Sequence, residues 1–154
     1  MREQPRGSGP PPVPEAGEVA EALDVDLVYD VLHPDWGGRI PRLVEAPGHR
    51  LWGRARPVPP EAVSAVCRLE ADLGRATEER RVRVRTAAGA LSEAVAFSPP
   101  ATGLSTEGPV SERYLRALAL SAERAGLPVD YVQRLQAEAQ IVATLQQLGR
   151  SKRR

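Results

Sequence analysis

The chain has 154 residues, of which 42% are hydrophobic and 27% charged, and its formal net charge is +1. This composition is typical of one soluble globular domain, and the small charge argues against nucleic acid or an anionic membrane as a partner. The single cysteine, Cys67, excludes an intrachain disulfide. Together with an N-terminus that lacks a signal-peptide pattern, it predicts a cytoplasmic protein. The sequence contains no run of about 18 apolar residues, so it predicts no membrane-spanning helix.

Composition changes along the chain predict one domain between two tails. Residues 1–17 are rich in proline and glycine and offer almost no apolar surface to bury. We therefore expect a disordered tail over 1–21, a folded domain over 22–148 and a basic, frayed C-terminus over 149–154.

The predicted elements alternate between strands and helices. In chain order they are a helical turn at 18–23, strands at 26–32, 39–46 and 51–58, a helix at 60–73, strands at 80–86 and 91–97, and helices at 111–125 and 128–148. A turn is expected at 46–50, and Pro41 weakens the second strand. We predict an α+β fold, a small mixed β-barrel or sheet of about five strands with flanking helices.

Several local signals make these elements specific. In the strand 80–86, Val82 and Val84 are predicted to face the core, with arginines on the opposite face. Ser111 is expected to cap a helix that ends at Gly126. The buried positions predicted for the last two helices are Tyr114, Leu115, Leu118, Ala122 and Ala125, then Tyr131, Leu135, Val142 and Leu145. The loop 98–110 is long enough to suggest a function.

Glu70 is the most unusual residue of the predicted helix 60–73. It falls within the apolar stripe formed by Val63, Val66, Cys67 and Leu73, where every other side chain is uncharged. A carboxylate directed toward a core must be paired, hydrogen-bonded or protonated. Two interpretations follow: a structural one, with an ion pair to an arginine or a misplaced helix boundary, and a functional one, in which a raised pKa serves catalysis.

The remaining polar residues predict no further chemistry. His33 and His49 are expected in exposed loops, and their surroundings do not form a metal-binding motif. Cys67 is expected to be a small core residue. Tyr114, in the first turn of its helix, is either a core aromatic or part of a site. No phosphate-binding, dinucleotide or metal motif is present, so no cofactor and no metal are predicted.

Four stretches of the sequence resemble the gamma-glutamylcyclotransferase-like family. They are DWGGRIPRLVEAPGHRLWG (35–53), PPEAVSAVCRLEADLG (59–74), EERRVRVRTAAGALSEAVAF (78–97) and GPVSERYLRALALSAERAGLPVDYVQRL (108–135). The last stretch is the most specific, because it holds both a Ser-x-x-Tyr helix start and a Gly-Leu-Pro-x-x-Tyr element. The resemblance implies a small β-barrel with flanking helices.

The resemblance also implies a lyase- or transferase-type reaction that needs no cofactor. Such enzymes cyclise a γ-glutamyl amine or peptide to 5-oxoproline and release the amine. On the matched positions, Glu70 would be the catalytic acid and base, and Tyr114 would contact the substrate. Partial burial would raise the pKa of Glu70 toward the range that this role requires.

The sequence departs from the family pattern in its substrate-binding loop. It contains no Tyr-Gly-Ser-Asn segment, which the resemblance implies for binding the α-carboxylate, and Ala71 and Thr77 replace a usual glycine and tyrosine. Three alternatives remain open: another segment such as Gly37-Gly38 binds the anion, the chain is a degenerate or truncated copy, or it is a non-catalytic binding module of the same fold. In the last case a homo-oligomer or a partner chain would complete the sheet.

Overall fold

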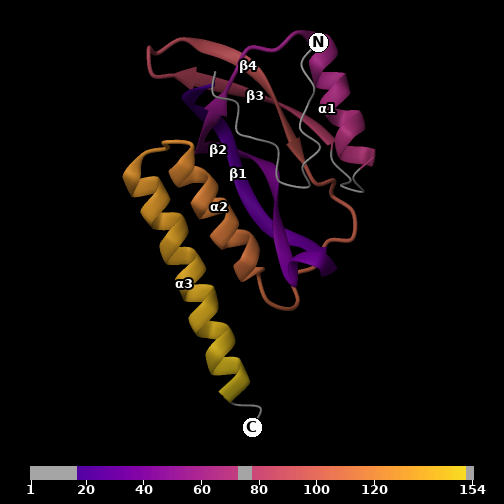
Figure 1. Ribbon diagram of the computed structural model, residues 1–154, viewed down its shortest axis with the longest axis vertical. Helices are drawn as coiled ribbons and strands as arrows, with labels where there is room; N and C mark the ends of the chain where they lie inside the picture. Colours follow the sequence, from indigo (N-terminus) through magenta and orange to yellow (C-terminus); the bar gives the residue numbers. More distant parts are fainter. Residues whose placement is uncertain (1–16, 73–77, 152–154) are drawn as a thin grey trace, which may run out of the picture.

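The computed structural model describes residues 17–72 and 78–151, without the side chains of residues 66, 67, 69–72 and 151. Its elements are β1 (Glu18–His33), the short 3₁₀ helix η1 (Pro34–Trp36), β2 (Gly38–Ala55), α1 (Pro60–Asp72), β3 (Glu78–Thr86), β4 (Leu91–Ser98), α2 (Glu112–Arg124) and α3 (Val129–Ser151). The α+β class predicted from the sequence is confirmed (Figure 1).

The sheet is antiparallel and has the strand order β2-β1-β3-β4. It has four strands within the described residues, and it is not closed into a barrel. The strand count differs from the prediction because the expected strands 39–46 and 51–58 are one continuous strand, β2. The helical turn predicted at 18–23 is also wrong: β1 begins at Glu18, so residues 18–21 are strand rather than tail.

A bulge explains why the predicted turn at 46–50 does not end β2. Leu23 pairs with Arg50 and Val25 pairs with Glu45, so four residues of β2 lie opposite the single residue Asp24. Asp24 has a φ of 57°, in the left-handed region that Asp tolerates better than most residues. Its Oδ1 accepts a hydrogen bond from the Gly48 N–H at 3.0 Å. The Pro-Gly segment is therefore a β-bulge held by Asp24.

Asp24 also connects β1 to β3. Its second carboxylate oxygen accepts a hydrogen bond from the Arg83 guanidinium. The backbone hydrogen bond from Gly48 and the bond from Arg83 lower the pKa of Asp24 below its usual value. Pairing between β1 and β3 covers only Ala20–Leu23 against Arg83–Thr86 and stops immediately before Asp24.

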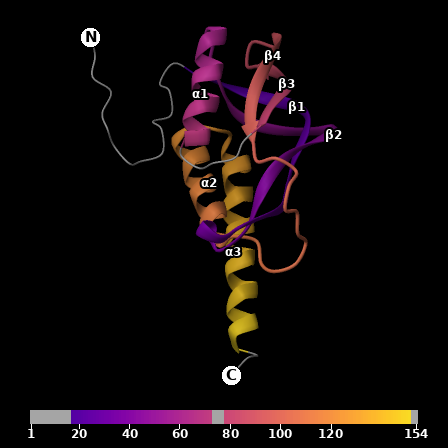
Figure 2. The same ribbon diagram turned by 90° about the vertical axis from the view of Figure 1, so that its right-hand side faces the viewer.

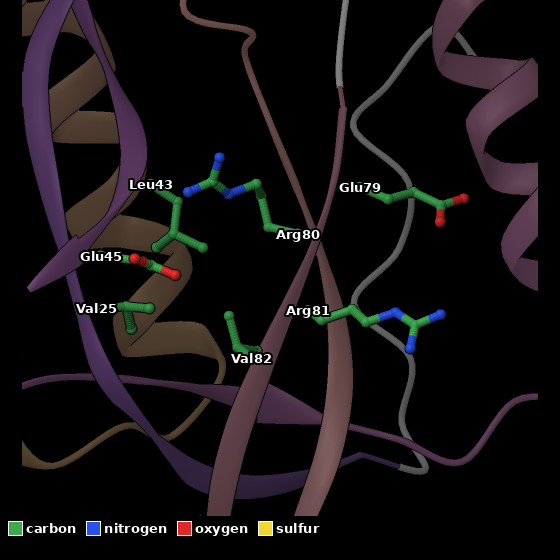
Figure 3. A pocket seen from close by; sticks show the side chains of 7 residues that line it. All are labelled: Val25, Leu43, Glu45, Glu79, Arg80, Arg81 and Val82. Carbon is green, nitrogen blue, oxygen red and sulfur yellow. The ribbon is translucent and has the colours of Figure 1, made fainter.

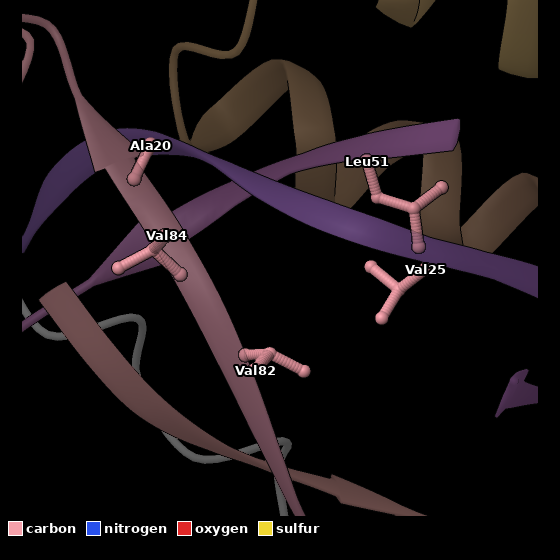
Figure 4. Close-up of a cluster of buried hydrophobic side chains, with 5 residues drawn as sticks. All are labelled: Ala20, Val25, Leu51, Val82 and Val84. Carbon is pink, nitrogen blue, oxygen red and sulfur yellow. The ribbon is translucent and has the colours of Figure 1, made fainter. Parts of the chain in front are cut away.

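The sheet buries one apolar cluster, shown in Figure 4. Its members are Ala20, Val25, Leu51, Val82 and Val84. The predicted orientation of β3 is confirmed, since Val82 and Val84 are buried while Arg81, Arg83 and Arg85 are exposed. Side chains alternate between the two faces of a strand, and one face of β3 is exposed to solvent, which accounts for this pattern.

The helices α2 and α3 form an antiparallel hairpin on one side of β1 and β2 (Figures 1 and 2). They share a second core of Ala119, Ala122, Val132 and Leu135. Ser111 caps α2 as predicted, and Gly126 follows it with a φ of 72°. Leu145, predicted to be buried, is 62% exposed, because it lies on the outward face of α3 with Ile141, while Ala139 and Ala143 are the buried residues of this part of the helix.

The long loop between β4 and α2 is attached to the end of the β1–β2 hairpin. The Ser105 N–H donates to the Asp30 carbonyl at 2.8 Å, and Leu104 forms a β-bridge with Val31. Arg39 donates from Nε to the Gly108 carbonyl at 3.0 Å. These bonds give the loop a structural role, which the sequence did not predict.

An ion pair between β1 and β2 lies close to this loop. Arg42 donates to both carboxylate oxygens of Asp30, at 2.8 and 3.0 Å. The two side chains are only 20% and 12% exposed. Bidentate geometry and partial burial distinguish this pair from the more exposed Arg50–Glu21 pair, which is 3.5 Å long.

Replacing Arg42 with methionine should destabilise the fold, because it leaves the Asp30 carboxylate without its cationic partner. We expect Arg42→Met to lower the free energy of unfolding by about 2 kcal/mol or more. The matched control Arg50→Met, on the same strand, should change it by less than about 0.5 kcal/mol. Urea denaturation of both variants measures the difference, and equal losses would contradict this assignment.

Candidate active site

A cleft opens in the sheet where β1 and β3 separate. The last β1–β3 pair is Leu23 with Arg83, and beyond Asp24 the two strands no longer share hydrogen bonds. The cavity there has a volume of about 310 Å³, and we call it the β1/β3 cleft. It is lined by Val25, Leu43, Glu45, Glu79, Arg80, Arg81 and Val82. This volume lies at the lower end of the range for small-molecule sites.

The cleft combines an apolar floor with two opposite charges. Val25 and Val82 belong to the buried cluster of the sheet, and Leu43 packs against that cluster. Figure 3 shows Arg80 and Val82 directed from β3 toward β2, where Glu45 and Leu43 are directed toward β3. A guanidinium and a carboxylate thus face one cavity whose floor is apolar.

Strand alternation separates Arg80 from its neighbours. In Figure 3, Glu79 and Arg81 are directed away from β2, to the other side of β3. Arg81 is 83% exposed and pairs with Glu93 of β4 at 3.4 Å. The arginines of this strand were predicted to form one solvated face, and Arg80 does not belong to it. Its even spacing from Val82 and Val84 was the signal that could have identified it.

Tyr114 lies in a different part of the molecule, where α2 begins against η1. The Ser111 hydroxyl donates to the Trp36 carbonyl at 2.6 Å and accepts from the Tyr114 N–H at 3.1 Å. The rings of Tyr114 and Trp36 meet edge to face, with centroids 5.1 Å apart. Gly38 fits closely beneath this junction: a Cβ there would lie 2.8 Å from the Pro109 carbonyl oxygen. The start of α2 is therefore fixed on the β1–β2 turn.

Burial raises the pKa of all three tyrosines in the chain. Tyr114 shows the effect of burial alone. For Tyr29, burial is the largest cause, and the negative charge of Glu138 adds to it. For Tyr131, burial outweighs the opposing effect of Arg134, whose guanidinium carbon lies 5.4 Å from the ring centroid. Each hydroxyl therefore stays protonated at neutral pH and can donate a hydrogen bond.

Glu70 lies in the last turn of α1, three residues after Cys67, as the periodicity predicted. Its side chain is outside the described part of the structure, as is Thr77. In Figure 1, α1 is well separated from α2, the helix that carries Tyr114. The geometry of Glu70 relative to Tyr114 thus stays a prediction.

The two histidines have different environments. His49 is exposed, as expected, and its Nδ1 lies 3.3 Å from an Asp26 carboxylate oxygen. His33 was expected in an exposed loop, but it ends β1 and is half-buried. Its Nδ1 is buried and has no hydrogen-bond partner within the described residues. Across those same residues, no three His, Cys, Asp or Glu side chains are grouped to hold a metal ion.

The sequence profile of the AIG2-like family matches residues 50–135. The chain belongs to the AIG2-like family. This family is part of the gamma-glutamylcyclotransferase superfamily, so the resemblance noted in the sequence is confirmed. The matched segment of this AIG2-like chain includes α1, β3 and most of the α2–α3 hairpin.

Two solved structures share the fold of this AIG2-like chain. One is a gamma-glutamyl cyclotransferase, and the other is an uncharacterized protein from Homo sapiens. Each is 22% identical, has a TM-score of 0.63, and aligns over 79% of this chain and 73% of its own. No curated protein sequence matches the chain. Within the described ranges, we find no helix with the length and apolarity that crossing a bilayer requires.

Alkaline titration tests the burial of the tyrosines. The chain has three tyrosines, so tyrosinate absorbance reports on Tyr29, Tyr114 and Tyr131 alone. In the native protein their midpoints should lie above the value of about 10 seen in unfolded chains. Because the folded-state pKa values are raised, stability should be intact below about pH 10 and fall as the pH rises above it. Coincident titrations of the native and urea-unfolded protein would contradict the assignment.

Proposed function

We propose that this AIG2-like protein cyclises a γ-glutamyl amine or peptide to 5-oxoproline and releases the amine. The observation that carries the proposal is the family match over 50–135, which includes both Glu70 and Tyr114. The described cleft adds a space of about 310 Å³ with an apolar floor and charged walls, which suits a small polar substrate. We expect a cytoplasmic enzyme.

The reaction can proceed with one acid–base group. The α-amine nitrogen forms a bond to the γ-carbonyl carbon, and the bond from that carbon to the departing nitrogen breaks. The attacking amine loses a proton and the departing nitrogen gains one, so no water or redox partner is consumed. In the proposal Glu70 accepts the first proton and returns it to the leaving group. The substrate supplies its own nucleophile, so proximity supplies much of the acceleration.

Tyr114 is proposed to contact the substrate as a hydrogen-bond donor. Burial raises the pKa of its hydroxyl, so the group keeps its proton at neutral pH. Within the described part of the chain, this hydroxyl makes no hydrogen bond, whereas the backbone N–H of Tyr114 is held by Ser111. A fixed helix start and an unused donor are consistent with a substrate-binding role.

A non-catalytic binding module of the same fold is the second candidate. The observation that favours it is the sequence itself, which contains no Tyr-Gly-Ser-Asn segment of the kind that the resemblance implies for binding the substrate. Such a module, a degenerate or truncated copy of the enzyme, would act through binding or interaction and would not convert a γ-glutamyl substrate.

Replacing Glu70 with glutamine separates the two candidates. We expect Glu70→Gln to reduce 5-oxoproline release from γ-glutamyl amino acids by about 100-fold or more, because the amide cannot exchange the proton. The control Glu61→Gln, in the first turn of the same helix, should leave the rate unchanged. Chromatographic measurement of 5-oxoproline gives the rates. Equal background rates in the wild type and both variants would remove the enzymatic proposal and favour the binding module.

A further inference from the structure

The β1/β3 cleft contains a cation that is only weakly engaged. The Arg80 guanidinium lies 3.4 Å from a carboxylate oxygen of Glu78, and these side chains are 35% and 44% exposed. A single long contact between half-exposed groups contributes little free energy, and among the described residues it leaves most of the five guanidinium donors unused. Arg80 can therefore bind an anion from solution without losing a strong internal partner.

The opposite wall of the cleft offers an anion. Glu45, on β2, makes no ion pair or side-chain hydrogen bond with the residues that the structure describes. It pairs through its backbone with Val25, so its position follows from the register that the Asp24 bulge imposes. Its carboxylate is directed toward the cleft in Figure 3.

The floor between the two charges is apolar. Val25, Leu43 and Val82 supply it, and two of the three belong to the buried cluster of the sheet. A guanidinium, a carboxylate and a short aliphatic surface together match a zwitterionic α-amino acid with a methylene side chain. An arginine fork fits a carboxylate in two-point geometry, and a carboxylate accepts hydrogen bonds from an amine in either protonation state.

We propose that the β1/β3 cleft binds the α-amino-acid end of a γ-glutamyl compound, with Arg80 at the α-carboxylate and Glu45 at the α-amine. The choice of ligand class rests on the proposed function. The cleft would take the role that the missing Tyr-Gly-Ser-Asn segment leaves open, and it differs from the Gly37-Gly38 turn that the sequence suggested. Gly38 lies against the Pro109 carbonyl oxygen and the Ser111 backbone, so part of that turn is already occupied.

The test is a calorimetric titration of the full-length Glu70→Gln protein with γ-glutamylalanine. In that background, Arg80→Gln should raise the dissociation constant by about tenfold or more, because it removes a charge-assisted contact. The matched control is Arg85→Gln, an exposed arginine on the same strand that does not line the cleft. It should change the constant by less than about twofold.

Altered ligands show which group each side chain binds. Amidation of the glutamyl α-carboxylate should lower the affinity of the ligand for the parent protein. It should cause no further loss in Arg80→Gln, because the contact between this carboxylate and Arg80 is already absent there. N-acetylation of the glutamyl α-amine should likewise lower affinity for the parent protein, and it should cause no further loss in Glu45→Gln. Arg80→Lys keeps the charge without the fork and should give an intermediate constant.

Three results would overturn the inference: no binding to the parent protein at millimolar concentration, equal effects of Arg80→Gln and Arg85→Gln, or additive losses from Arg80→Gln and ligand amidation. Failure of the proposed function is distinguishable. If wild-type protein binds γ-glutamylalanine through Arg80 and releases no 5-oxoproline, the catalytic proposal fails and the binding inference stands.

Discussion

Asp24 controls how the strands of this protein are arranged. Its left-handed backbone, with a φ of 57°, interrupts β1, and its carboxylate binds the Gly48 N–H of β2 and the Arg83 guanidinium of β3. On one side of Asp24, β1 pairs with both neighbours; on the other side it pairs with β2 alone. The sheet therefore stays open after this residue, and the β1/β3 cleft begins at the next one, Val25.

The open sheet and the attached helices separate two candidate regions. The cleft lies between β3 and the β1–β2 hairpin, with Arg80 and Glu45 on its walls. The start of α2, with Ser111 and Tyr114, is fixed on the hairpin turn at Trp36. In the proposed reaction, a substrate that reached both regions would exchange its proton with Glu70, so the catalytic proposal depends on α1.

Features determined by neighbouring residues were predictable from the sequence. The Ser111 cap acts over three residues, and the orientation of Val82 and Val84 follows from strand alternation, so both predictions are confirmed. The same alternation would have placed Arg80 in the core-facing row. The position of Glu70 in α1 also follows from local periodicity, whereas the surroundings of its side chain depend on tertiary packing.

Features that depend on distant residues were not predictable in this way. The Pro-Gly segment within 46–50 has the composition of a turn, and only its contact with Asp24, 24 positions earlier than Gly48, makes it a bulge inside one strand. For the same reason the sequence suggested a barrel of about five strands, whereas the sheet is open and four-stranded in the described residues. The cleft exists because the sheet is open, so no sequence motif predicts it.

The most direct test of this account is the backbone contact pattern across β1 and β3, measured by nuclear Overhauser effects. The account predicts interstrand backbone contacts for the pairs from Ala20–Thr86 to Leu23–Arg83. It predicts none between Val25 and Arg81 or between Asp26 and Arg80, the positions that would pair if the ladder continued in register past Asp24. Backbone contacts at those two positions would mean that the sheet closes over the cleft, and they would contradict the account.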